Sequence, residues 1–255
     1  MRFASLGSGS RGNATLIEAG ETLLLVDCGY SVREFEGRCR VLGVEPDTID
    51  ALLVTHEHGD HLKGVGALAR KYGLSVWMSH GTSCAGRCGV LPELHLFSVH
   101  GTGFRIGDLR VIPFPVPHDA REPCQFVFAH GGRRFGLLTD AGHITPYMRT
   151  HLEGLDLMLL ECNHDAAMLA SGPYPPSLRR RVGGRFGHLS NDQAATLLSG
   201  LDRSRLAHLV LGHLSETNNH PELARTTVLE RCGDLEPVLS VLAQDDCSDW
   251  FSLDA

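Results

Sequence analysis

The sequence predicts an α/β fold, and three observations favour it. Apolar, β-prone runs alternate with helix-patterned segments over the first third of the chain, which is typical of a layered α/β arrangement. Short β-prone runs broken by Gly and Pro follow, and strands and helices alternate again after residue 145. The 255 residues suffice for a large buried core, and no long linker or repeat divides them, so we expect a single domain over residues 1–255.

In the first third, strands are predicted by apolar runs at residues 2–6, 14–17, 22–27, 49–54 and 74–78. The spacing of apolar residues predicts helices at 31–42 and 62–72. The Gly- and Ser-rich segment 7–13 is either a tight hairpin connection or a loop that offers backbone N–H groups to an anion. Asp27, at the end of its strand, is either a turn former or a hydrogen-bond partner of a metal ligand.

The middle segment, residues 94–128, predicts mostly antiparallel strands because its β-prone runs are broken by Gly and Pro. Gly131 and Gly132 predict a β-hairpin between runs 125–130 and 134–139. Beyond it, strands are predicted at 155–160, 206–211 and 237–242, and helices at 145–152, 194–201 and 221–231. Ser190 and Gln193 predict a capping box for the second of these helices. Seven Pro or Gly residues predict a loop or broken helix over 171–187.

The composition limits the classes of protein to consider. Acidic residues outnumber basic ones, 30 against 23, which argues against a general polyanion-binding surface but leaves room for a local basic groove. The N-terminus has no apolar signal segment and no apolar run is long enough to span a membrane, so we expect neither export nor insertion. The eight Cys are scattered without a Cys-x-x-Cys pair, which indicates reduced thiols and a cytoplasmic protein.

One short run concentrates potential metal ligands, namely His56, His58, Asp60 and His61. It lies between the predicted strand 49–54 and the predicted helix 62–72, where side chains at the carboxyl end of a strand converge on a crevice. Packing does not explain such a cluster, because each buried polar side chain would need its own partner. Imidazoles and carboxylates together suit zinc, manganese or iron, so the run predicts a metal site.

Four more ligand-type residues follow later predicted strands: His118, Asp140, Glu161 and His213. Three His can hold one metal and leave a position for water, while Asp60, His61 and a further His can hold a second. A carboxylate from Asp140 can bridge the two ions, and ions about 3.5–4 Å apart suit in-line attack at phosphorus. We therefore expect two divalent ions, Zn²⁺ or Mn²⁺, with Fe²⁺ as an alternative.

The chain resembles the metallo-β-lactamase superfamily over nearly its whole length. The resemblance is carried, in order and spacing, by His-x-His-x-Asp-His at 56–61, His118, Thr139-Asp140 and His213. It implies a four-layer αββα sandwich in which Asp27 matches the family's strand-end Asp near the site. It also implies that one metal is held by His56, His58 and His118, that the other is held by Asp60, His61 and His213, and that Asp140 bridges them.

The runs 5–13, 117–120, 161–165, 187–191 and 213–219 narrow the resemblance to the YycJ/WalJ group, small cytoplasmic bacterial proteins associated with DNA exonuclease activity. The chain also resembles a reduced tRNA 3′-processing endonuclease Z. Only 22 positions separate His118 from Asp140, which leaves no room for that enzyme's tRNA-binding arm. The 73 residues from Asp140 to His213 are too few for the inserted domain of the β-CASP branch.

The expected function is that of a dinuclear-metal phosphodiesterase, a nuclease and by resemblance an exonuclease, acting on DNA rather than RNA. A metal-bound hydroxide would attack phosphorus. The alternatives are a thioester or lactone hydrolase of the glyoxalase-II-like type, a small-molecule cyclic phosphodiesterase, and a redox or non-catalytic binding protein. Glyoxalase-II-like enzymes usually add a helical C-terminal domain, whereas residues 220–255 leave room for one helix and one strand.

His188 is the candidate general acid, because breaking a phosphodiester requires a proton for the leaving oxygen. Glu161, at a predicted strand end, can approach the same cleft and hold the imidazole. By resemblance, His188 and Glu161 match the pair thought to protonate the leaving group in endonuclease Z. Asp60 can accept a proton from metal-bound water. Alternatively, His188 is a structural neighbour of the helix that Ser190 caps.

Two further segments offer substrate contacts. The run 163–165, which endonuclease Z lacks, offers Asn163 and His164, and His164 is also a rival acid. A basic cluster precedes the candidate acid and consists of Arg179, Arg180, Arg181 and Arg185. Guanidinium groups bind phosphate through paired hydrogen bonds, so Arg181 and Arg185 are the predicted phosphate contacts. The alternative is a solvated loop.

Overall fold

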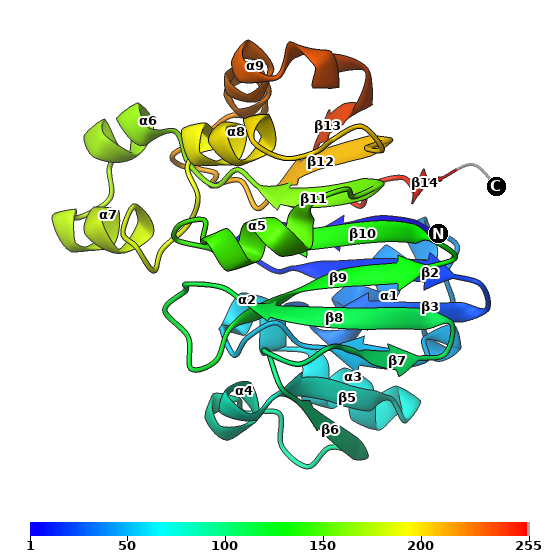
Figure 1. Ribbon diagram of the computed structural model, residues 1–255. Coiled ribbons are helices and arrows are strands. Elements are labelled where there is room, and N and C mark those ends of the chain that lie inside the picture. The colour runs from blue at the N-terminus through cyan, green and yellow to red at the C-terminus, as the bar shows by residue number, and fades with distance from the viewer. Residues whose placement is uncertain (254–255) are drawn as a thin grey trace.

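Two seven-stranded sheets lie face to face in the computed structural model, which describes residues 1–253 (Figure 1). The first sheet has the spatial order β14 (Phe251–Ser252), β1 (Arg2–Gly7), β2 (Ala14–Ala19), β3 (Thr22–Val26), β4 (Ala51–Leu53), β5 (Ser75–Ser79) and β6 (Glu93–Phe97). The second has the order β13 (Leu239–Val241), β12 (His208–Gly212), β11 (Leu157–Glu161), β10 (Arg133–Leu138), β9 (Cys124–His130), β8 (Leu109–Pro115) and β7 (Phe104–Ile106).

Each sheet is antiparallel in one half and parallel in the other. Strands β3 to β6 are parallel in the first sheet, and β10 to β13 are parallel in the second. The carboxyl ends of parallel strands meet at one edge of a sheet and leave a crevice there. The two parallel halves therefore decide where a site can be assembled.

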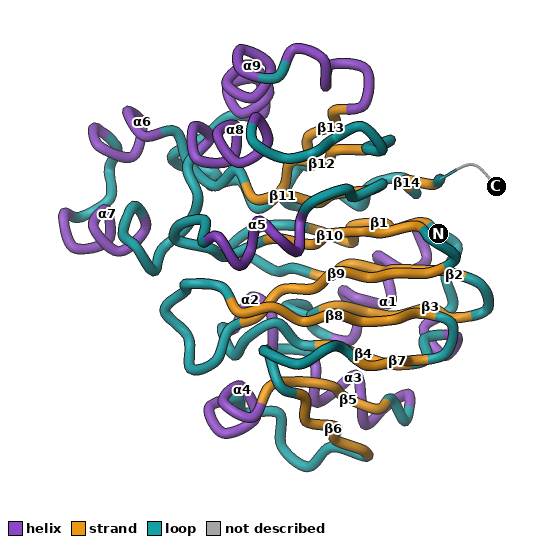
Figure 2. Tube along the Cα trace, viewed as in Figure 1, coloured by secondary structure: helices purple, strands orange, loops and turns teal. Residues whose placement is uncertain are grey.

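Helices cover the outer faces of both sheets, so that the molecule has four layers (Figure 2). The first sheet is covered mainly by α1 (Val32–Val41) and α3 (Val65–Tyr72), and the second by α5 (Pro146–Leu152), α8 (Asn191–Ser199) and α9 (Pro221–Arg231). The shorter helices are α2 (Gly59–Leu62), α4 (His80–Ala85), α6 (Ala166–Ser171), α7 (Pro176–Val182), and the 3₁₀ turns η1 (Pro46–Thr48) and η2 (Gly233–Val238). The predicted αββα sandwich is confirmed.

The strands hold the layers together because successive side chains point to opposite faces. In β12, Leu209 and Leu211 pack against α8 and α9, whereas Val210 packs between the sheets. The β3 strand alternates in the same way between its covering helices and the second sheet. Across the sheets, Phe3 stacks on Phe135 with ring centroids 4.2 Å apart. This aromatic pair joins the two halves of the molecule.

The predicted helix 62–72 is divided in the structure, because α2 ends at Leu62 and α3 begins at Val65. The division lies at Gly64, whose N–H donates to the carbonyl of Cys28 at 2.8 Å. A side chain at Gly64 would collide with the carbonyl of Tyr30, so the loop after β3 occupies the space that a continuous helix would need. The first of the two helices, α2, begins at Gly59, inside the metal-ligand run.

The segment 94–128 is mostly antiparallel, as predicted, because β7 pairs with β8 and β8 with β9 in this way. Its first strand, β6, is the exception and pairs with β5 in parallel. It does so because α4 and the following loop carry the chain back along the sheet, which parallel pairing requires. The segment 171–187 is a broken helix, one of the two forms predicted for it, because α7 stands between its Pro and Gly residues. The capping box of Ser190 and Gln193 and the hairpin at Gly131-Gly132 are confirmed.

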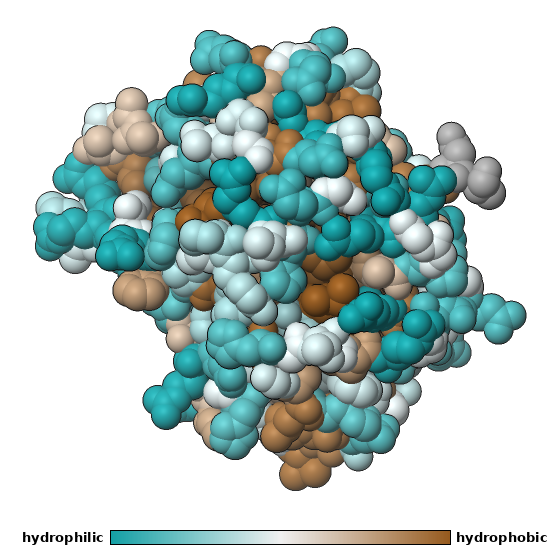
Figure 3. All heavy atoms as spheres, viewed as in Figure 1, coloured by the Kyte–Doolittle hydropathy of each residue, from teal (hydrophilic) through white to brown (hydrophobic). Residues whose placement is uncertain are grey.

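The visible surface and the thiols agree with the composition. The face in Figure 3 is largely hydrophilic, with apolar residues in small patches. All eight cysteines are free thiols. Over residues 1–253, no helix combines the length and the apolar content needed to cross a membrane.

Candidate active site

The predicted site residues follow strand ends at the crevice edge of the two sheets. Asp27 directly follows β3, Asp140 lies just beyond β10, and His213 directly follows β12. Their φ angles are 60°, 50° and 54°, and in the described chain no other non-glycine residue has a positive φ. Such backbone conformations cost about 1–3 kcal/mol each and persist only where the surroundings fix them. Here the strained turns bring three polar side chains to one crevice.

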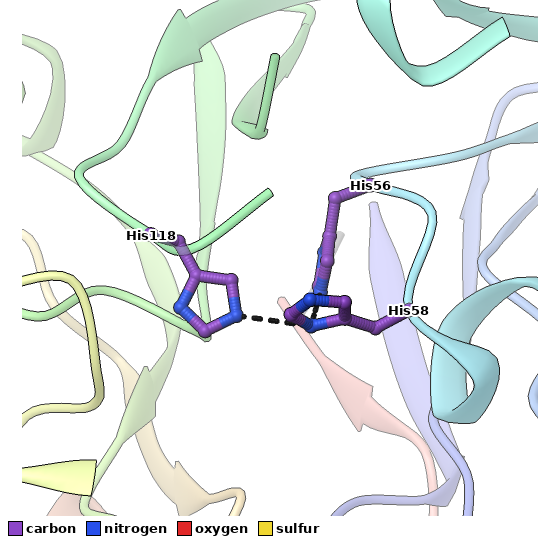
Figure 4. A group of neighbouring side chains, drawn as sticks. All are labelled: His56, His58 and His118. Carbon is purple, nitrogen blue, oxygen red and sulfur yellow. Dashed lines mark hydrogen bonds between the residues drawn. The ribbon is translucent and has the colours of Figure 1, made fainter. Parts of the chain in front are cut away.

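Three imidazoles converge in the first predicted metal site (Figure 4). The Nδ1 atom of His58 lies 3.1 Å from Nε2 of His56 and 3.2 Å from Nε2 of His118. His56 and His58 come from the turn after β4, and His118 comes from the loop after β8. Three imidazole nitrogens at this spacing could hold a metal ion, and their number is the one used by tetrahedral sites that keep one position open.

A second group of donors adjoins the first. Nitrogen and oxygen atoms of Asp60, His61 and His213 lie within 4.8 Å of one another. Asp140 lies between the groups: its carboxylate oxygens are 3.1 Å from Nε2 of His61, 3.6 Å from Nε2 of His213 and 3.9 Å from Nε2 of His118. A carboxylate in this position can reach ions held by either group.

The donor atoms fit divalent metal ions. Asp140 Oδ2 and His213 Nε2 are buried and make no hydrogen bond in the structure. A buried polar atom without a partner costs about 1–3 kcal/mol, and such atoms are rare in folded proteins. A cation held among these donors would satisfy both atoms. Imidazole and carboxylate donors in this ratio suit Zn²⁺, Mn²⁺ or Fe²⁺.

The charges of the cluster favour a cation as well. Burial would raise the pKa of Asp140, but the imidazoles of His213 and His61 hold it well below its usual range. Burial would lower the pKa of His213, but the carboxylates of Asp140, Asp60 and Glu161 raise it to about 10. The carboxylates are therefore ionised and draw positive charge into a buried site. A divalent ion supplies that charge and displaces protons from the imidazoles.

Buried carboxylates orient the imidazoles from behind. Asp27 Oδ2 lies 2.8 Å from Nδ1 of His61, and Asp27 also accepts hydrogen bonds from the N–H and hydroxyl of Thr55. Glu161 Oε1 lies 2.9 Å from Nδ1 of His213. A hydrogen bond at Nδ1 fixes the ring and leaves Nε2 to face the crevice. Asp27 is thus the partner of a predicted ligand, one of the two roles open to it from the sequence.

With this geometry the chain can be compared with known proteins. Residues 22–213 match the family model of the beta-lactamase superfamily domain. The chain belongs to the metallo-β-lactamase superfamily. The match covers most of the chain and includes every predicted metal ligand, so the predicted family is confirmed.

Two curated relatives identify the group within this superfamily. The chain is 38% identical to exodeoxyribonuclease YycJ of Bacillus anthracis over 89% of its own length and 88% of the relative's. It is 36% identical to exodeoxyribonuclease WalJ of Streptococcus pneumoniae over 90% and 87% of the two lengths. The structure of the short form of human tRNase Z aligns over 100% of both chains with a TM-score of 0.68 and 16% identity, which shows the shared fold.

Four predicted ligands of this metallo-β-lactamase-fold protein, namely His58, Asp60, Asp140 and His213, line a cavity of about 350 Å³. One wall is formed by the turn containing His58, Gly59 and Asp60. The other wall is formed by α7 and the segments beside it, and it includes Tyr174, Leu178, Arg181, Val182, Gly187 and His188. The cavity therefore joins metal-binding donors to a basic residue and the candidate acid.

His188 contacts the partner expected from the sequence. Its Nδ1 lies 2.8 Å from Oε1 of Glu161, and its side chain is 21% exposed in the cavity wall. Burial would lower the pKa of His188, but the Glu161 carboxylate raises it above its usual value. With Nδ1 engaged, Nε2 is the nitrogen available to a substrate. Ser190 does cap α8 as expected, so the two roles considered for His188 are compatible.

The predicted substrate contacts fall into two groups. Arg181 lines the cavity, and its Nε donates to Asp119 Oδ2 at 2.5 Å. Arg185 is exposed but is not part of the cavity lining. Asn163 and His164 are buried behind the site, where the Asn163 amide donates to the carbonyl of His213 at 3.0 Å. The contacts of Asn163 in the structure are those of a residue that positions His213.

Sequence reasoning did not propose the cavity-lining residues Asp119, Tyr174, Leu178 and Val182, and it left the role of the segment 7–13 open. Asp119 adjoins His118 and so carried a visible signal, whereas the other three lie in the segment predicted as a loop or broken helix. The segment 7–13 is the hairpin connection between β1 and β2, and it also contributes Ser10 to the cavity. The same connection brings Asn13 Nδ2 to within 3.0 Å of Nε2 of His61.

Proposed function

We propose that the protein is a dinuclear-metal phosphodiesterase that acts on DNA as an exonuclease. One observation above all supports this function: the carboxylate of Asp140 lies within 3.9 Å of imidazole nitrogens from both predicted metal sites. That arrangement suits two ions sharing one carboxylate, which is a common design for cleaving phosphodiesters. Relatives that match most of the chain are named exodeoxyribonucleases, which favours DNA as substrate.

The proposed ligands divide into two sets. One ion would be held by His56, His58 and His118, the other by Asp60, His61 and His213, and Asp140 would contact both. When bound, Zn²⁺ or Mn²⁺ ions would supply Lewis acidity and offset the negative charge of the phosphate. Asp60 lines the cavity with 24% of its side chain exposed, so it is the residue proposed to take a proton from the attacking water.

The proton for the leaving oxygen would come from His188. As the bond between phosphorus and the leaving oxygen breaks, that oxygen gains negative charge, and a proton from Nε2 neutralises it. Glu161 holds the opposite nitrogen at 2.8 Å and stabilises the charged imidazolium that donates this proton. Arg181, in the same cavity wall, would bind a phosphate oxygen.

A substrate panel tests the proposal. Purified protein loaded with Mn²⁺ or Zn²⁺ is incubated with linear duplex DNA, single-stranded DNA, RNA, bis-p-nitrophenyl phosphate and S-lactoylglutathione. We expect stepwise release of nucleotides from DNA ends and turnover of the aryl phosphodiester. Hydrolysis of the thioester without attack on any phosphodiester would contradict the proposal and favour a glyoxalase-II-like enzyme. Faster degradation of RNA would contradict the choice of DNA.

A further inference from the structure

The cavity has two chemically different walls. One wall carries the predicted metal ligands His58, Asp60, Asp140 and His213. The other wall carries Arg181 and His188 and also the apolar side chains of Tyr174, Leu178 and Val182, which we call the apolar wall. Binding a phosphate to metal ions requires no apolar surface, so these three side chains have no part in the chemistry described above.

Two of the three apolar side chains lie on one face of α7. Leu178 and Val182 are four residues apart in this helix, so one lies above the other, and Tyr174 stands two residues before the helix begins at Pro176. All three are only partly buried, because they border the cavity and not the core. The carbonyl of Val182 accepts a hydrogen bond from the N–H of His188 at 2.9 Å. The apolar wall is therefore joined directly to the candidate acid.

Arg181 adds a phosphate-binding group to the same wall. Its side chain is 60% exposed and its only ion-pair partner among the described residues is Asp119. A pair this exposed contributes about 0–1 kcal/mol, so a phosphate can replace Asp119 at little cost. The wall thus offers a cationic group for a phosphate beside an apolar surface for the rest of a nucleotide.

We infer that this apolar wall binds the base of a single unpaired nucleotide whose phosphate lies at the metal-binding donors. The inference rests on the proposed nuclease function. The cavity of about 350 Å³ is near the small end of ligand pockets, which span roughly 300–1,000 Å³. A volume of this size suits one nucleotide better than a base pair, so we expect a strand end to separate from its complement before it is cut. Base stacking on aromatic side chains is a sequence-tolerant way to hold such an end.

The test asks whether the effect of a substitution in the apolar wall depends on the presence of the base. Tyr174→Ala and Leu178→Ala are compared with wild type on a single-stranded oligonucleotide and on the same strand with an abasic residue at either end. On the intact strand, each variant should lose roughly 5- to 100-fold in kcat/KM, the usual range for one lost stacking contact. The kcat/KM of wild type should fall by a similar factor when the bound base is missing from the strand. On that abasic strand, the kcat/KM of each variant should be close to that of wild type.

Controls separate this inference from other causes. Tyr147→Ala removes a 43% exposed aromatic side chain on α5 that is not part of the cavity lining, and it should leave the rate unchanged. Metal content and unfolding temperature should match wild type in every variant, because the wall carries no predicted ligand. A duplex with a mismatched terminal pair should be cut faster than its matched counterpart.

Distinct outcomes overturn the inference and the proposed function. If wild type cuts intact and abasic strands equally fast, or if the variants lose the same factor on both, the wall does not bind a base, although the nuclease function stands. Equal rates on matched and mismatched duplexes would overturn the need for an unpaired end. If the metal-loaded wild type cuts no DNA at all, the nuclease function fails and the inference fails with it.

Discussion

His188 and His213 share one carboxylate oxygen. Oε1 of Glu161 lies 2.8 Å from Nδ1 of His188 and 2.9 Å from Nδ1 of His213. The other oxygen, Oε2, accepts hydrogen bonds from the N–H groups of Ala141 and Leu189 at 3.0 Å. Burial would raise the pKa of Glu161, but these partners, His188 foremost, lower it to about 2. Glu161 therefore stays ionised and orients the proposed acid and a proposed metal ligand together.

The first prediction separates these two roles. His188→Ala should keep the metal content of wild type, because the proposed ligand sets do not include it, but it should lower the rate on DNA by roughly 10²–10⁴-fold, the usual loss for a missing general acid. The loss on bis-p-nitrophenyl phosphate should be much smaller, because nitrophenolate departs without a proton. Steady-state rates on both substrates measure the difference.

Glu161→Gln serves as the comparison variant. It should lower the rate and also weaken metal binding, by roughly 10–100-fold, because it removes the partner that orients His213. Equal losses of His188→Ala on the two substrates would contradict the general-acid role. Loss of metal from His188→Ala would instead make His188 a ligand, a role that its position among Asp140, Glu161 and His213 allows.

The second prediction concerns Asp140, the carboxylate proposed to contact both ions. Asp140→Ala should lower the number of bound ions per chain and abolish turnover, because Asp140 is the one proposed ligand that contacts both sites. Metal analysis after gel filtration, with protein purified without added metal, measures the loss. Asp192→Ala is the matched control, since this exposed carboxylate on α8 lies outside the cavity lining. Two ions retained by Asp140→Ala would overturn the bridging role.

The sequence predicted the candidate ligands well because their signals are local. His56, His58, Asp60 and His61 stand in one run, and a strand followed by a helix dictates where that run lies. Asp140 and His213 were recognisable because each follows an apolar strand. The positive φ angles of these two residues were not predictable, since Asp and His adopt the left-handed region more often than most residues but still uncommonly, and the surrounding site holds the backbone there.

The parts that sequence reasoning did not predict depend on tertiary contacts. The Pro and Gly residues around α7 predicted a loop or a broken helix without deciding between them, and Pro176 in the first helical turn is compatible with the second. The β6 strand carries no local mark of its parallel partner, because strand polarity is decided by the path of the intervening chain. The apolar wall of the cavity was not predicted, because no local signal showed which side chains of this segment would line the site.

The third prediction tests the contact between the sheets. Phe135→Ala should lower the free energy of unfolding by about 3–5 kcal/mol, because Phe135 is fully buried and stacks on Phe3 across the sheets. Urea denaturation measures the change. Phe186→Ala makes the same chemical change at a 60% exposed position and should stay within about 0.5 kcal/mol of wild type. Equal effects of the two variants would contradict the packing described here.

The fourth prediction concerns Arg181 and its partner. Arg181→Gln should weaken DNA binding and lower the slope of log Kd against log salt by roughly one unit. The reason is that a variant with one phosphate contact fewer displaces fewer counterions from the DNA when it binds. Asp119→Asn should have the opposite effect on affinity, since it frees Arg181 and removes a negative charge from the cavity. Fluorescence anisotropy, with protein whose metal has been removed by a chelator, measures DNA binding without cleavage.

Arg185→Gln and Arg40→Gln complete this series of arginine variants. Arg185 is exposed just before His188, so if it also contacts phosphate, as predicted, the double variant with Arg181→Gln should lose roughly two units of slope. Arg40 is an exposed residue in the last turn of α1 that is not part of the cavity lining, and removing its charge should leave the slope unchanged. If Arg181→Gln and Arg40→Gln have the same slope as wild type, Arg181 is a solvated surface residue and the cavity binds phosphate through its metal-binding donors alone.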